Sequence, residues 1–252
     1  MSKYAYLTCE TCKNKLTSGG VKASSDLKYF IDINKAVAAL TDDATLIFYS
    51  NYKLKNYVVI NYRCTIDLNG YRITGNTFSF INKATIINDN VLSGGYIEIY
   101  ENSASADVEI KVSKTTEVSL EVGWGKVKMY GGKLVGLKTL NKVTIRDLLP
   151  EEYVYVLYDE VVSKTLTYAE TNVQAIDGNF DYIDIVPCKH NDFDVDYKCV
   201  YCNKTLTTNE AIQILLDELQ IAKQELQDAI DNKANVTTIN AKISSLEKAI
   251  DD

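Results

Sequence analysis

The chain has 252 residues, of which 46% are hydrophobic and 10% aromatic, which is enough to bury a core and excludes a disordered tail. Its formal net charge is −7, with 27 basic and 34 acidic residues spread without blocks, so a nucleic-acid-binding footprint is missing. Tyrosine occurs 18 times and proline only twice, a composition that indicates a β-rich protein with a helical end.

The N-terminal segment, residues 1–23, lacks the apolar stretch and small-residue cleavage site of an export signal. No apolar run of about 18 residues occurs in the chain, so we expect no membrane span. Four of the six cysteines lie in CxxC pairs, a spacing that favours metal binding over disulfides, so we expect synthesis in a reducing cytoplasm. Cys9 and Cys12 form a CxxC pair with no Cys-x-His before it. Two interpretations stay open for this pair: a metal half-site completed by another chain, or two idle or reversibly oxidised thiols.

One short amphipathic helix is predicted over about 26–41, at the start of a segment that spans 24–150. Its N-cap would come from Ser24, Ser25 or Asp26. Apolar residues then follow at helical spacing, at Phe30, Ile33, Val37 and Leu40.

Short strands are predicted next, each three to five residues long and about ten residues apart. They are Thr45–Tyr49, Tyr57–Ile60, Cys64–Leu68, Phe78–Ile81, Ala84–Ile87, Tyr96–Tyr100, Val108–Val112, Val118–Val122, Lys126–Tyr130 and Val143–Ile145. An antiparallel sandwich and a parallel β-helix both have this pitch. The breaks, such as Asn69-Gly70, Gly94-Gly95 and Gly131-Gly132, favour the solenoid, with the helix as its cap.

Residues 20–203 resemble β-helix modules in surface proteins of gut bacteria and their phages. The opening is carried by residues 32–40, Ala44-Thr45-Leu46-Ile47 and residues 65–71, and the closing by residues 143–153 with the cysteines downstream. The resemblance implies a short right-handed parallel β-helix followed by a β-rich closing segment over 151–187. It also implies a surface setting.

A compact metal motif occupies residues 188–204. Cys188, His190, Cys199 and Cys202 give the pattern C-x-H-x8-C-x2-C, and His190 is the only histidine. Four nitrogen and sulfur ligands leave no coordination position open, so the pattern predicts a structural Zn²⁺ knuckle rather than a hydrolytic site. The alternative is a solvated loop with one disulfide and two spare thiols. Cys64, within a strand, is expected to be a small buried hydrophobe.

No active site can be assembled from the sequence, and we expect no enzymatic activity. Candidate carboxylates are Asp67, Asp89, Glu98, Glu109 and Glu121. Asp67 and Asp89 lie in turn-like contexts, and the glutamates alternate with aliphatic residues as outward strand positions do. The single histidine already belongs to the metal motif, and no nucleophile elbow or phosphate loop is present.

The C-terminal segment, residues 205–252, is predicted to be a coiled coil. After the capping sequence Thr208-Asn209-Glu210, apolar residues follow at alternating spacings of three and four, at Ile212, Leu215, Leu219, Ala222, Leu226 and Ala229. A second seam, displaced in phase, comprises Ile239, Ile243, Leu246 and Ile250. The chain either stammers or turns between the seams. A partner helix is expected to cover the stripe; an intramolecular helical hairpin is the alternative.

Residues 232–247 also resemble the coiled-coil segments of phage tail and head fibres, which are usually trimeric. The expected function is therefore that of a bacteriophage fibre or capsid-decoration protein on the virion surface. It would be a homotrimer through residues 209–252, would contact other virion proteins, and would attach to a host surface or glycan. The alternatives are a fragment of a bacterial cell-surface adhesin and a polysaccharide depolymerase.

Overall fold

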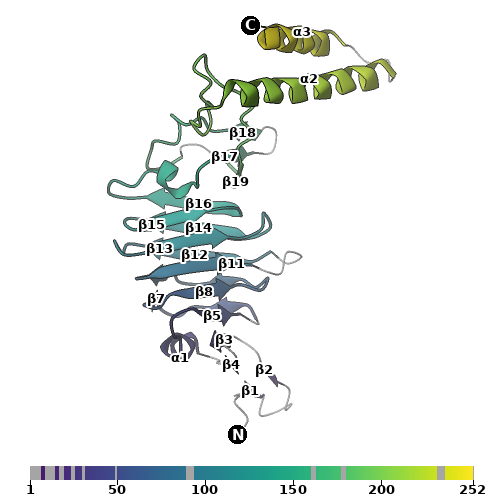
Figure 1. Ribbon diagram of the computed structural model, residues 1–252. Coiled ribbons are helices and arrows are strands. Elements are labelled where there is room, and N and C mark those ends of the chain that lie inside the picture. The colour runs from purple at the N-terminus through teal and green to yellow at the C-terminus, as the bar shows by residue number, and fades with distance from the viewer. Residues whose placement is uncertain are drawn as a thin grey trace. The chain divides into compact units, whose positions relative to one another are not determined.

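The protein divides into two compact units, Met1–Pro187 and Cys188–Asp252, in the computed structural model (Figure 1). The structure describes residues 32–251 except 49, 89–93, 160–162, 177–179 and 232–235. Of the first 31 residues it describes only the backbone of four short strands, β1 (Leu7–Thr8), β2 (Lys15–Leu16), β3 (Gly20–Ala23) and β4 (Asp26–Tyr29).

The first unit is built on a parallel β-solenoid, in which successive turns of the chain stack strand upon strand (Figure 1). One sheet stacks in parallel β7 (Val58–Ile60), β10 (Phe78–Phe80), β12 (Tyr96–Glu101), β14 (Glu117–Val122) and β16 (Lys133–Thr139). The other stacks β5 (Ala44–Ile47), β8 (Cys64–Asp67), β11 (Lys83–Ile87), β13 (Asp107–Lys111) and β15 (Lys126–Met129). A smaller parallel pair joins β6 (Tyr52–Lys53) to β9 (Ile73–Thr74). The mainly β class and the solenoid expected from the short strands are confirmed.

Buried side chains form columns because the strands of successive turns pair in register. In one such column every residue is fully buried, and its members are Leu46, Ile66, Ile86, Ile110 and Met129. Strand burial alternates accordingly in β12 and β14, and the inward residues are aliphatic except Glu101 at the end of β12. The interior is therefore one continuous apolar core along the stack.

Polar side chains in the loops form hydrogen bonds that join each coil of the solenoid to the coil before it. Asn69, which has a φ of 47°, donates from Nδ2 to the carbonyl of Phe48 at 3.1 Å. Asn82 and Asn141 make the same kind of bond to carbonyls about one turn earlier in the chain. Gly70, with a φ of 82°, donates its N–H to Asn88 Oδ1 at 2.7 Å. The Asn-Gly break read from the sequence is thus a left-handed turn that satisfies backbone groups.

Antiparallel strands continue both sheets beyond the parallel stack. At one end β3 pairs with β5 and with β4. At the other, β19 (Tyr182–Pro187) pairs with β16 and with β17 (Tyr153–Tyr158), which pairs with β18 (Ser163–Thr165).

The strand predicted over Val143–Ile145 is wrong. These residues lead into a 3₁₀-helix, η1 (Ile145–Leu148), because the Asp147 carboxylate accepts hydrogen bonds from the backbone N–H and the hydroxyl of Thr144. Strand β16 was not predicted. It contains Gly136 and follows Gly131 and Gly132, which obscure the alternation of a strand.

The N-terminal helix is shorter than predicted and begins later. Helix α1 spans Ile33–Ala38, and Asp32 caps it by accepting the N–H of Asn34 at 2.8 Å, whereas Asp26 opens strand β4. Ile33 and Leu40 are buried in the same core as the solenoid interior, as their spacing predicted.

The C-terminal segment forms two helices, α2 (Thr208–Asp231) and α3 (Thr237–Asp251), that pack against each other. Ala222, Ile243 and Leu246 are buried between them, and Lys223 pairs with Glu247 at 3.0 Å. The helical hairpin within one chain, which was the alternative expectation, is therefore what the structure shows, because the second seam packs against the first. The phase displacement between the seams arises because the second seam lies on a separate helix, α3, rather than further along α2.

No helix within the described part of the chain is long and apolar enough to cross a membrane.

The buried Glu101 is expected to make the stability of the first unit depend on pH. Its carboxylate has no exposed surface and accepts the N–H groups of Phe80 and Ser103, each at 2.8 Å. Burial raises the pKa of Glu101 above its usual 4.5. The folded protein therefore keeps this proton to a higher pH than the unfolded chain does, so this group's contribution to stability falls as pH rises above about 4.5.

Urea unfolding at a series of pH values above about 4.5 should show the free energy of unfolding falling with pH in the wild type. In Glu101→Gln it should fall less steeply. Glu121→Gln, at a partly exposed carboxyl, is the control for the loss of a carboxylate as such. Equal slopes in wild type and Glu101→Gln would contradict the assignment.

Candidate metal centre

Four metal-ligating side chains come together in the second unit. The sulfur atoms of Cys188, Cys199 and Cys202 and a ring nitrogen of His190 all lie within 4.8 Å of one another. Cys188 Sγ is 3.4 Å from Cys199 Sγ, and Cys202 Sγ is 3.3 Å from His190 Nδ1. The structure therefore brings together the residues singled out by the C-x-H-x8-C-x2-C pattern.

Tight turns stabilised by backbone hydrogen bonds place the last two cysteines. Asp194 Oδ1 accepts the N–H groups of Asp196 and Lys198, both at 2.9 Å, and shapes the turn before Cys199. After Cys199, its carbonyl accepts the N–H of Asn203 at 2.8 Å, where the φ of 64° reverses the chain. Cys199 is 1% exposed and Cys202 7% exposed, so these ligands are shielded from water.

The first two ligands are held by a local backbone contact. His190 has a φ of 55°, and its N–H donates to Cys188 Sγ at 3.4 Å. An N–H donor to sulfur favours the thiolate, which is the form of cysteine that binds metals.

The electrostatics of the cluster favour a bound cation. Burial raises the pKa of both Cys188 and Cys202, and the neighbouring Cys199 sulfur raises them further. Backbone N–H groups of His190 and Lys204 act in the opposite direction on these two thiols. Burial therefore disfavours ionisation of Cys188 and Cys202 side by side unless a cation compensates their charge.

The separations between the ligand atoms can be compared with those around a tetrahedral ion. Nitrogen and sulfur ligands at about 2.0–2.3 Å from such an ion are separated from one another by about 3.5–3.8 Å. Two observed separations, 3.4 and 3.3 Å, fall just below this range, and none exceeds 4.8 Å. The cluster could hold a metal ion with all four ligands in place.

The other cysteines do not join this site. Cys64 lies in β8, is 6% exposed, and burial raises the pKa of its thiol to about 12, so it behaves as a small buried hydrophobe. Cys9 and Cys12 lie outside the described residues.

Two of the candidate carboxylates, Asp67 and Glu109, each have a local hydrogen-bond partner. Asp67 is 7% exposed, and its Oδ1 accepts the N–H of Asn69 at 2.8 Å, a turn-forming contact. Glu109 belongs to β13, where a hydrogen bond from Lys111 lowers the pKa of its carboxyl. Asp89 lies outside the described residues.

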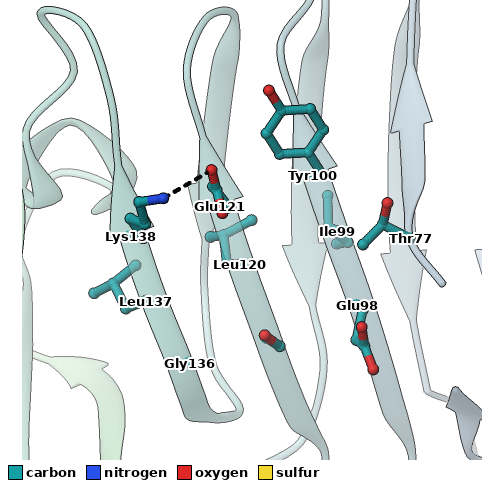
Figure 2. Close-up of a pocket in the computed structure, with 10 residues that line it drawn as sticks. Thr77, Glu98, Ile99, Tyr100, Leu120, Glu121, Gly136, Leu137 and Lys138 are labelled. Carbon is teal, nitrogen blue, oxygen red and sulfur yellow. Dashed lines mark hydrogen bonds and ion pairs between the residues drawn. The ribbon is translucent and has the colours of Figure 1, made fainter. Parts of the chain in front are cut away.

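Glu98 and Glu121, by contrast, line the same hollow on the face of the sheet that contains β12 and β14 (Figure 2). The sequence showed that both side chains point outward. It did not show that they share a hollow, because this depends on the register between strands.

Comparison with known proteins gives no further guide to this site. No protein-family model matches the chain, and neither a curated protein nor a solved structure matches it.

Replacing one thiolate ligand should abolish metal binding and leave the solenoid folded. Cys199→Ser removes the most buried ligand sulfur, and we expect its cobalt(II) titration to lack the thiolate-to-metal absorption of the wild type. The knuckle should unfold locally, whereas the thermal transition of the first unit should not move, since the two units have separate cores. Cys64→Ala, in the other unit, should retain the cobalt spectrum. Full cobalt binding by Cys199→Ser would show that these four residues are not the ligand set.

Proposed function

We propose that the protein is a non-enzymatic structural protein of a bacteriophage particle, a fibre or capsid-decoration subunit that attaches to the host surface. The observation that carries this proposal is the continuous in-register core of the solenoid, which makes its outer faces a rigid display surface. The bacteriophage setting rests on the two sequence resemblances. Localisation at the virion surface, with synthesis in the host cytoplasm, follows from that setting.

Within this proposal the parts of the chain have separate roles. The winding of the solenoid is right-handed, as parallel crossovers are in nearly all proteins. Helix α1 protects the apolar end of the core, since Ile33, Ala36 and Leu40 are buried in it. The metal bound by Cys188, His190, Cys199 and Cys202 is Zn²⁺, because three sulfur ligands and one nitrogen suit a closed structural zinc site.

We further propose that residues 209–252 form a homotrimeric coiled coil in which helical hairpins associate. Helix α3 covers only one side of α2. Leu215, Leu219 and Leu226 remain half-buried. On the adjoining side, Ile212, Leu216 and Ile230 are 36%, 42% and 53% exposed, and at about 100° per residue they lie within about 40° of one another. A second apolar stripe is therefore available to other copies of the chain.

Light scattering should give three times the 28.2 kDa chain mass for the intact protein, and one chain mass after deletion of residues 209–252. A double variant, Leu216→Gln with Ile230→Gln, tests the interface without disturbing the fold, because both side chains are exposed in the single chain. It should be monomeric, because it removes two apolar side chains of the second stripe. Ile221→Gln is the matched control. Ile221 is 57% exposed but lies about 140° around the helix from Leu216, so this variant should stay trimeric. A monomeric wild type would overturn the proposed trimer.

Elemental analysis should find about one zinc per chain in protein purified under reducing conditions. Zinc should fall below stoichiometry in His190→Ala, which lacks the single nitrogen ligand. Protein free of metal, or loaded with iron in place of zinc, would contradict the zinc assignment.

The bacteriophage setting is tested separately by mass spectrometry of purified particles together with the genes beside the coding sequence. Capsid or tail genes alongside, and peptides of this chain in the particles, would support it. Cell-wall anchoring genes, or a longer reading frame with an export signal, would favour the bacterial adhesin instead.

A further inference from the structure

The hollow on the sheet of β12, β14 and β16 has a volume of about 390 Å³. Its residues come from four successive strand positions of the stack, from Thr77, just before β10, to β16. Strands in a sheet are about 4.8 Å apart, so the hollow is about 14 Å long across the strands. This length and volume suit a short oligomeric ligand that lies along the stack.

The register of the strands explains why this part of the face is hollow. Glu98, Ser119 and Gly136 are aligned across the three strands, so side-chain size falls along the row. A Cβ atom on Gly136 would lie 2.7 Å from Ser119 Oγ, which leaves no space for a side chain there. The parallel row, Tyr100, Glu121 and Lys138, stands beside it as a wall (Figure 2). The row that ends at Gly136 is therefore the floor.

The hydrogen-bonding groups of the hollow suit hydroxyl groups on a ligand. Tyr96 donates its hydroxyl proton to Glu98 Oε1 at 2.8 Å, which orients this carboxylate as an acceptor. Burial, followed by this hydrogen bond, raises the pKa of Tyr96 to about 12, so the donor keeps its proton near neutral pH. The Arg72 guanidinium lies 4.8 Å from the centre of the Tyr96 ring and pairs with Glu117 at 2.9 Å, which holds the tyrosine in place.

The wall offers a ligand both a hydrogen-bond acceptor and a donor, and their use by a ligand takes little from the stability of the fold. Glu121 and Lys138 form an ion pair at 3.3 Å, drawn as a dashed line in Figure 2, and their side chains are 35% and 58% exposed. Such an exposed pair contributes little to stability. Its carboxylate and ammonium can therefore turn toward a ligand without a large loss to the fold.

Aromatic rings complete the site. Tyr100 lines the hollow, and the ring of Tyr57, 43% exposed, lies 6.5 Å from it. Exposed tyrosine faces offer flat apolar surface beside polar groups, which matches the C–H faces of a sugar ring next to its hydroxyl groups. The charged groups of the hollow, two carboxylates and one ammonium, sum to −1, which disfavours an anionic ligand.

We infer that this hollow binds a neutral oligosaccharide of about three sugar units, laid across the strands from Thr77 to Gly136. Its hydroxyl groups donate to Glu98 and Glu121 and accept from Lys138, and one ring stacks on Tyr100. This inference rests on the proposed attachment function and assigns it to named residues and a class of ligand.

The test uses the full-length protein on a microarray of neutral tri- and tetrasaccharides of glucose, galactose, mannose, rhamnose and N-acetylglucosamine, with uronic-acid oligomers alongside. The wild type should bind at least one neutral probe and none of the uronic-acid oligomers. Calorimetry on the best probe should show about tenfold weaker binding for Tyr100→Ala and for Glu98→Gln, each of which removes one contact from the hollow. Tyr62→Ala and Glu109→Gln, at a surface tyrosine and at a glutamate of the other sheet, are the matched controls and should bind as the wild type does.

Circular dichroism and the thermal transition of each variant exclude loss of fold as the cause. Binding of acidic probes only, no binding at all, or undiminished binding by both Tyr100→Ala and Glu98→Gln would overturn the inference. Reducing ends released from a bound probe would show that the site is hydrolytic, which contradicts a purely binding role. A trimeric protein that binds no glycan would contradict this inference but not the proposed fibre assembly. A monomeric protein would contradict the fibre assembly, whatever the microarray shows.

Discussion

In-register stacking of parallel strands is the constraint on which the first unit depends. Each turn of the chain must place an aliphatic side chain over that of the turn before it, as in the fully buried column from Leu46 to Met129. A slip by one residue would turn the apolar row outward and the polar row into the core. Turn asparagines such as Asn69 and Asn141, bonded to carbonyls of the preceding turn, oppose such a slip.

The same register that builds the core also arranges the outer face. Outward side chains that lie far apart in the sequence are aligned in rows across the strands. One row, Glu98, Ser119 and Gly136, forms the floor of the hollow. The next row, Tyr100, Glu121 and Lys138, forms its wall. We expect this surface to be rigid, because the core beneath it is close-packed. The metal cluster belongs to the other unit, and its four ligands lie within fifteen residues of chain, so it can stabilise its own turns without support from the solenoid.

Much of this organisation could be predicted where local chemistry decides the structure. The Asn69-Gly70 turn, the alternation in β12 and β14, and the grouping of Cys188, His190, Cys199 and Cys202 all follow from short sequence patterns. Prediction failed where a tertiary or competing local signal decided. β-Branched residues at Val143–Ile145 indicated a strand, yet the bond from Thr144 to Asp147 starts a 3₁₀-helix. Helix α2 finds its cover in α3, a pairing that heptad spacing alone could not distinguish from a pairing between chains.

The hollow shared by Glu98 and Glu121 could not be predicted from the sequence for the same reason. Which outward residues become neighbours depends on loop lengths and on the irregular register between Val118 and Ser119. Its role is tested most directly by a crystal structure of the full-length protein grown with the best-binding neutral trisaccharide. The account predicts a trimer in which each chain holds the sugar against Tyr100, with hydroxyl groups within hydrogen-bond distance of Glu98 and Glu121. Sugar bound elsewhere with the hollow empty, in a protein that is a monomer, would contradict it.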